Sequence, residues 1–154
     1  MEPQEIILKW KDVEYDRKTM RKWLACHGFR QCGTVTNKIA VTDGTIIVKF
    51  DAHVSRDGSD HTRAEHLAYA RSKDQRKKYI VPTLAYHKGL LIQPFLQNVN
   101  EEWKTPNDAL EIARKFRFSH HWHFGFLDGA IKFFDVDSSG SGWWNWKKRA
   151  EKKH

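Results

Sequence analysis

The segment 118–137 constrains the fold more than any other part of the sequence. Asp128 and Gly129 separate two short apolar runs, which is a strong signal for a two-residue β-hairpin turn. A histidine-rich stretch precedes this hairpin, and Asp135 and Asp137 follow it. Because alternate residues of an extended strand point to the same face, the two aspartates should share one side. The hairpin therefore predicts that imidazoles and carboxylates meet at one edge.

The histidine-rich stretch contains His120, His121 and His123. If it is extended, His121 and His123 share one side while His120 faces the other. Together with Asp135 or Asp137, these side chains could form a mixed nitrogen and oxygen site for zinc. The alternative is that the histidines cap backbone groups in a tight loop and bind no metal.

This order of loop, hairpin and acidic strand end resembles the catalytic loop and metal-binding strand of the protein-kinase-like superfamily. In that superfamily a loop of the type Asp-x-His-x-x-Asn precedes a hairpin that ends in a magnesium-binding Asp. The pattern places Phe118 at the catalytic Asp and His120 at the His. It places His123 at the Asn and Asp135 at the metal-binding Asp. Phe118 and His123 depart from the pattern.

The resemblance extends upstream, where the superfamily has a glycine turn, a strand lysine, a helix glutamate and a hinge. Lys49 ends an apolar run and takes the place of the lysine that contacts ATP. Glu65 follows it after sixteen residues, within a helix expected over 61–73, so an ion pair between the two is geometrically reasonable. The other nucleotide-binding positions are Gly33 in a turn over residues 32–37, and Gln93 and Phe95 in the hinge.

The fold class implied is α+β. It combines a kinase N-lobe-like antiparallel sheet and one packed helix with a vestigial second lobe of one helix and a β-hairpin. Asp43 and Gly44 predict a hairpin in the sheet. Thr105 as N-cap and Pro106 at the first helical position predict the start of the second-lobe helix. A single domain over 1–154 is expected. Its first two parts are an N-terminal helical extension over 1–28 and the sheet with its helix over 29–97. Its last two parts are a reduced second lobe over 98–137 and a Trp-rich basic tail over 138–154.

Positive charge is unevenly distributed in this chain, whose net charge is +8. One cluster over 9–22 surrounds an amphipathic helix expected from Asp16 to His27, a second lies over 71–78, and the third is the tail. Such a surface attracts polyanions, although solvated basic faces also keep proteins soluble. Two cysteines form no disulfide framework, and the absence of a long apolar run predicts no signal peptide and no membrane span. The expected location is cytoplasmic.

Three functions remain open from the sequence. The resemblance implies a kinase-like protein that binds ATP and Mg²⁺, either a degenerate pseudokinase or a minimal phosphotransferase. Lys49 would contact the phosphates, and Glu65 would hold Lys49 in place. The metal would be bound by Asp135, Asp137 and His123. His120 and His123 would occupy catalytic positions. The first alternative is a kinase-fold protein without enzymatic activity that binds a protein partner, for example a viral inhibitor of host machinery. The second is a basic nucleic-acid-binding protein.

Overall fold

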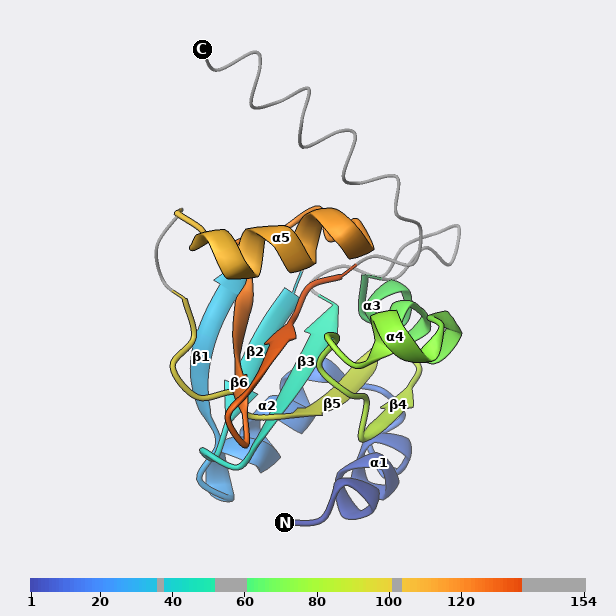
Figure 1. Cartoon of the computed structure of the whole chain (residues 1–154). Coiled ribbons are helices and arrows are strands. Elements are labelled where there is room, and N and C mark those ends of the chain that lie inside the picture. Colours follow the sequence, from blue (N-terminus) through green and yellow to red (C-terminus); the bar gives the residue numbers. More distant parts are fainter. Residues whose placement is uncertain (36–37, 52–60, 101–103, 137–154) are drawn as a thin grey trace. The chain divides into compact units, whose positions relative to one another are not determined.

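The computed structural model describes residues 1–35, 38–51, 61–100 and 104–136 (Figure 1). The α+β class is confirmed, because a five-stranded antiparallel sheet with helices is accompanied by a separate β-hairpin. The described helices are α1 (Pro3–Asp12), α2 (Arg17–Cys26), α3 (His61–Arg71), α4 (Asp74–Lys77) and α5 (Asn107–Phe116). The described strands are β1 (Arg30–Val35), β2 (Lys38–Thr42), β3 (Ile46–Asp51), β4 (Ala85–His87), β5 (Leu90–Pro94), β6 (Phe124–Leu127) and β7 (Ala130–Phe133).

The chain divides into two compact units. The first contains Met1–His66 and Pro82–Phe95, and the second contains Leu67–Val81 and the chain from Leu96 onward. Helix α3 begins in the first unit and ends in the second. No helix among the described residues is both long enough and apolar enough to cross a membrane.

The sheet of the first unit has the strand order β1-β2-β3-β5-β4, and each neighbouring pair is antiparallel. The predicted hairpin at Asp43 and Gly44 is confirmed between β2 and β3. The Asp43 carboxylate accepts hydrogen bonds from the backbone N–H groups of Thr45 at 2.9 Å and Ile46 at 3.0 Å. Gly44 has φ of 94°, a conformation that glycine adopts without steric cost.

Gly33 lies in a strand, and the prediction that it belongs to a turn is wrong. It pairs with Ala40 of β2, directly after an irregularity in register between Gln31 and Gly33. A glycine inside a strand commonly marks such a bulge, so its presence does not by itself indicate a turn. The connection between β1 and β2 at residues 36–37 lies outside the described residues.

One face of the sheet forms the apolar core of the first unit. Val41, Val48 and Ile92 are cross-strand neighbours in β2, β3 and β5, and each is at most 6 % exposed. The prediction of an amphipathic helix after Asp16 is confirmed by α2, and the Asp16 carboxylate caps it by accepting from the Thr19 N–H at 3.1 Å. The core also includes α1 and α2 residues: Ile6, Ile7, Trp10, Met20 and Leu24.

The second unit contains the predicted two-residue hairpin. Leu127 pairs with Ala130, and Asp128 and Gly129 have φ of 51° and 81°, as a type I′ turn requires. The core of this unit consists of Ala68, Ile80, Ala109, Ala113, Phe118, Phe124, Phe133 and Val136.

The N-cap of helix α5 lies one residue later than expected. Its first residue is Asn107, and Pro106 occupies the N-cap position. The prediction that Thr105 is the N-cap is therefore wrong, and the Thr105 hydroxyl instead lies 2.5 Å from Nδ1 of His121.

Candidate functional site

The second face of the sheet carries polar side chains where the first face carries apolar ones. Lys49 of β3 is aligned with Ala40 of β2 and with Leu91 of β5. Because side chains alternate between faces, Lys38 and Gln93, two residues from these partners, lie on the same face as Lys49. The alternation that buries Val41 and Val48 on one side therefore collects two lysines and a glutamine on the other.

These three side chains converge on Glu65 of α3. Lys49 Nζ donates to both carboxylate oxygens at 3.0 Å. Lys38 Nζ donates to Oε1 at 3.0 Å, and Gln93 Nε2 donates to Oε2 at 2.8 Å. Glu65 and Gln93 are each 1 % exposed, Lys49 5 % and Lys38 8 %, so this carboxylate cluster is buried.

Burial makes the contacts within the carboxylate cluster strong and mutually dependent. Removing an ionised group from water costs several kcal/mol unless opposite charge and hydrogen bonds replace the lost hydration. At Glu65 three donors supply that replacement. The ion pair between Lys49 and Glu65, which the kinase resemblance implied and their spacing permitted, is present, whereas its role toward a nucleotide stays a prediction.

Lys38 belongs to the carboxylate cluster although sequence reasoning did not select it. The alternation of side chains along β2 places Ile39 and Val41 on the apolar face of the sheet and Lys38 on the face of Lys49. To infer from this alternation that Lys38 lies near Lys49 requires the register between β2 and β3, which the sequence does not give.

The expected hinge residues lie at the end of β5. The Gln93 side chain is directed to Glu65, and the Phe95 N–H donates to the Thr45 carbonyl at 3.0 Å. Contact of either residue with adenine stays a prediction.

Asp51 fixes the beginning of α3 against the end of β3. Its carboxylate accepts from the Thr62 N–H at 3.0 Å and from the Thr62 hydroxyl at 2.5 Å. Its backbone carbonyl accepts from the guanidinium of Arg17 in α2. Since Thr62 precedes Glu65 by less than one helical turn, these bonds also set the position of the Glu65 carboxylate.

A turn in the second unit brings His120 and His123 to Asp135. The His123 N–H donates to the His120 carbonyl at 2.9 Å, which closes the turn. His120 Nδ1 donates to the Asp135 carbonyl at 3.2 Å, and His123 Nδ1 lies 3.4 Å from the Asp135 carboxylate. The extended arrangement, with His121 and His123 on one side, is not adopted, because the turn places His120 with His123 and directs His121 to Thr105. The alternative of a tight loop whose histidines bond backbone groups agrees with the His120 contact, and the binding of metal by this loop stays a prediction.

Phe118, at the position of the catalytic Asp in the kinase pattern, is a core residue. It is 1 % exposed, and its ring lies 4.8 Å from the ring of Phe133 and 4.8 Å from the Arg76 guanidinium. Within the described residues, no three His, Cys, Asp or Glu side chains form a group that could hold a metal ion. Asp137, the further predicted ligand, and the Trp-rich tail lie outside the described residues.

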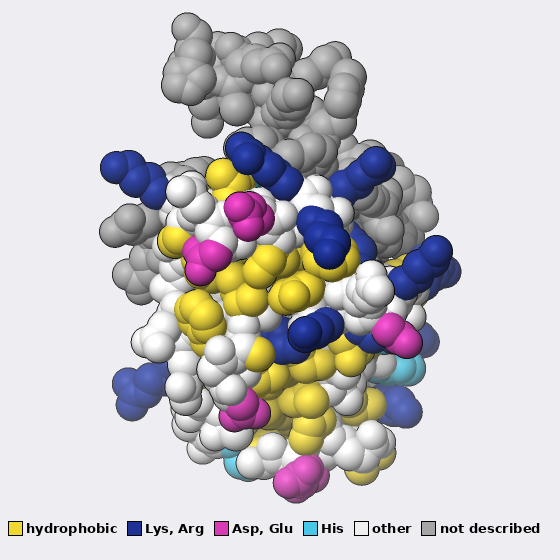
Figure 2. Space-filling view, viewed as in Figure 1, with side chains coloured by type: hydrophobic (Ala, Val, Ile, Leu, Met, Phe, Trp, Pro, Cys, Tyr) yellow, Lys and Arg dark blue, Asp and Glu magenta, His cyan; other side chains and the backbone are white. Residues whose placement is uncertain are grey.

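The carboxylate cluster of the first unit and the histidine turn of the second belong to a protein with a net charge of +8. Figure 2 shows more Lys and Arg than Asp and Glu side chains on the face that it presents. The chain matches no protein-family model and no curated protein.

The stability of the protein should depend on pH through His121. Burial, followed by the nearby charges of Arg114, His120 and His123, lowers the pKa of His121 from 6.5 to about 4. Between these pH values the unfolded chain binds a proton at His121 that the folded chain does not bind. The contribution of His121 to the free energy of unfolding is therefore fully present above pH 6.5 and is lost as the pH decreases toward 4. We expect a loss of about 2 kcal/mol in the free energy of unfolding, allowing for some solvent screening.

Urea denaturation at several pH values between 7 and 4 measures this effect. The variant His121→Gln should show a pH dependence smaller by about 2 kcal/mol. His27→Gln, at an exposed position, is the matched control and should retain the original dependence. An unchanged dependence in His121→Gln would mean that the folded protein tolerates the imidazolium.

Proposed function

We propose that this protein binds a nucleotide in the manner of protein kinases, and that Lys49 contacts the phosphates. The observation that carries the proposal is the bidentate ion pair of Lys49 with Glu65, buried on one face of an antiparallel sheet. In protein kinases a lysine of the third strand and a glutamate of the following helix must form such a pair for the nucleotide to be held productively. Here the lysine lies on β3 and the glutamate on α3, the next helix.

The order of elements also supports a kinase-like arrangement. A helix, a histidine-containing turn and a hairpin follow β5, and Asp135 comes directly after the hairpin region. The resemblance assigns Asp135 to Mg²⁺, for which carboxylate oxygen is a suitable ligand. Asp135 belongs to the second unit and Lys49 to the first, so each is tested by its own substitution.

Phosphotransfer is proposed to be weak or absent. The kinase loop Asp accepts or orients the hydroxyl of the phosphate acceptor, and its position is occupied by the buried ring of Phe118. General-base assistance is typically worth about 10²–10⁴-fold in rate. A nucleotide-binding pseudokinase therefore fits these residues better than an efficient phosphotransferase.

Nucleotide binding is tested by the melting temperature with and without millimolar ATP and Mg²⁺. A ligand present at about 100 times its dissociation constant adds about 2.7 kcal/mol, roughly 5–10 °C for a chain of this size. We expect Lys49→Arg to keep the ion pair with Glu65 and the fold, yet to lose most of the shift, because the guanidinium places its donors differently from an ammonium. Asp135→Asn should lose the part of the shift that requires Mg²⁺.

Lys11→Arg is the matched control for the lysine substitution, since Lys11 is exposed on α1. It should retain the full shift. Absence of any shift in the unsubstituted protein would contradict the proposal, and equal shifts in Lys49→Arg and Lys11→Arg would remove Lys49 from the binding site.

A second candidate function is a kinase-fold protein that binds a protein partner and no nucleotide. It is favoured by the depth of the carboxylate cluster, since Lys49 is only 5 % exposed and Glu65 1 %. In this case the cluster serves to hold α3 on the sheet. The thermal-shift experiment separates the two functions, because only the first predicts stabilisation by ATP.

A further inference from the structure

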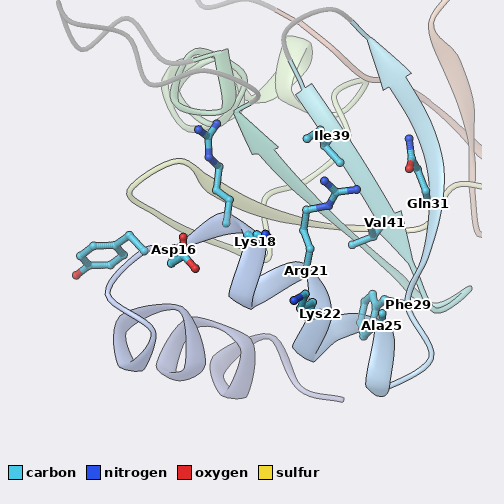
Figure 3. A pocket seen from close by; sticks show the side chains of 11 residues that line it. Asp16, Lys18, Arg21, Lys22, Ala25, Phe29, Gln31, Ile39 and Val41 are labelled. Carbon is cyan, nitrogen blue, oxygen red and sulfur yellow. The ribbon is translucent and has the colours of Figure 1, made fainter.

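The first unit contains a cavity of about 710 Å³ between α2 and the strands β1 and β2 (Figure 3). Figure 3 shows the Arg21 side chain rising from α2 toward β2, which carries Ile39 and Val41. A volume of this size lies within the range of protein binding sites. The cavity is lined by cationic and by apolar residues, among them Arg17, Lys18, Arg21, Lys22, Phe29 and Ile39.

The four cations all come from α2. Within the described part of the chain, the side chains of Lys18, Arg21 and Lys22 make no hydrogen bond or ion pair, whereas Arg17 donates to the Asp51 carbonyl. Asp16 is the acidic residue of the lining, and its carboxylate is engaged by the Thr19 N–H and hydroxyl. The side-chain hydrogen bond from Thr19 lowers the pKa of Asp16. Four cations of the lining therefore stand beside one carboxylate, and the cavity presents an excess of positive charge.

The placement of these cations is unfavourable for α2 itself. Arg17 and Lys18 occupy the first turn, where the positive end of the helix dipole disfavours cations by about 0.3–1 kcal/mol each. Arg17 with Arg21, and Lys18 with Lys22, are like-charge pairs at a spacing of four residues, which is also destabilising. A sequence that departs from local stability in this way commonly does so at a functional site.

A second basic cavity, in the second unit, has a structural explanation instead. Its volume is about 630 Å³, and Arg71 and Lys115 of its lining lie in the last turns of α3 and α5. Cations in a last turn stabilise the helix. Arg76 of the same lining donates to the Phe116 carbonyl at 2.9 Å. Helix stability accounts for Arg71 and Lys115, and the bond to Phe116 accounts for Arg76.

We infer that the α2 cavity binds an acidic segment of a partner protein, with an aliphatic side chain of that segment against Ile39. Carboxylates match the cations, and Arg binds them through two parallel hydrogen bonds. The lining favours a peptide over a nucleic acid, because base stacking requires an accessible aromatic face. Phe29 is only 3 % exposed, and the ring of Tyr15, which also lines the cavity, already packs against Trp10, His87 and Lys88. The inference is independent of the nucleotide proposal, since none of the lining residues belongs to the carboxylate cluster.

Fluorescence anisotropy with a labelled peptide of alternating Glu and Leu residues tests this site in the full chain. The double substitution Arg21→Glu with Lys22→Glu should weaken binding about tenfold or more, since each charge-assisted contact contributes more than about 1.4 kcal/mol. The matched control, Lys73→Glu with Lys115→Glu, makes the same change in net charge at the second cavity and should weaken binding less than about threefold. Melting curves establish that both variants are folded, as expected for exposed side chains.

Three outcomes would overturn the inference. The first is no binding of the Glu-Leu peptide, or equal binding of a peptide in which Gln replaces Glu. The second is an equal loss of affinity in the two double variants, which would indicate attraction to net charge alone. The third is tighter binding of a single-stranded thymidine oligonucleotide that Arg21→Glu with Lys22→Glu also removes, because the ligand class would then be a phosphate polyanion.

Discussion

Replacing Glu65 with Gln is expected to lower the free energy of unfolding by about 3 kcal/mol or more. The substitution keeps the shape of the side chain and removes the charge on which Lys38 and Lys49 both converge at 3.0 Å. Breaking a buried ion pair by removing one partner typically costs about 3–5 kcal/mol, because the remaining charge stays in a poorly solvated position. Urea denaturation followed by circular dichroism measures the change.

A double-mutant cycle identifies the origin of this loss. If two ammonium groups around a neutral amide cause it, Lys38→Met should recover part of the stability in the Glu65→Gln background. Glu5→Gln, on the exposed surface of α1, is the matched control and should change stability by less than about 0.5 kcal/mol. A loss below about 1 kcal/mol for Glu65→Gln would show that the carboxylate is not an essential counter-ion in the folded protein.

Local sequence signals predicted the features of this fold that depend on neighbouring residues. The turn at Asp128 and Gly129 follows from the need for positive φ at both positions. The start of α2 follows from the ability of Asp16 to cap the Thr19 N–H. The ion pair of Lys49 with Glu65 was implied by the kinase resemblance, and a spacing of sixteen residues permitted it.

Features that depend on strand register or on a single turn were not predicted. Lys38 enters the carboxylate cluster only because β2 and β3 pair as they do. Glycine is common in turns, but Gly33 lies in β1 beside a bulge. The turn from His120 to His123 decides between the two arrangements that the sequence left open, and it places His120 with His123. Residue type and periodicity specify neither the register of the strands nor the geometry of this turn.

Phe118→Asp, which would place an acidic residue where the kinase pattern has one, is expected to destabilise the second unit by more than about 4 kcal/mol. The side chain is 1 % exposed and packs against the ring of Phe133. Loss of a buried aromatic ring alone costs about 3–5 kcal/mol, and an unpaired carboxylate at the same position adds its desolvation. Urea denaturation, together with the dispersion of amide resonances in NMR spectra, measures the loss.

Two further variants separate packing from charge at this position. Phe118→Leu retains apolar volume and should cost about 1–2 kcal/mol, so the protein remains folded and measurable. Arg117→Asp introduces the same carboxylate one residue earlier, at an exposed position with φ of 59°, which Asp tolerates, and should cost less than about 1 kcal/mol. If Phe118→Asp were as stable as Arg117→Asp, Phe118 would be a replaceable loop residue, and a carboxylate could be placed here by a single substitution. The burial of Phe118 against Phe133 instead indicates that an acidic residue at this position requires the core of the second unit to be rebuilt.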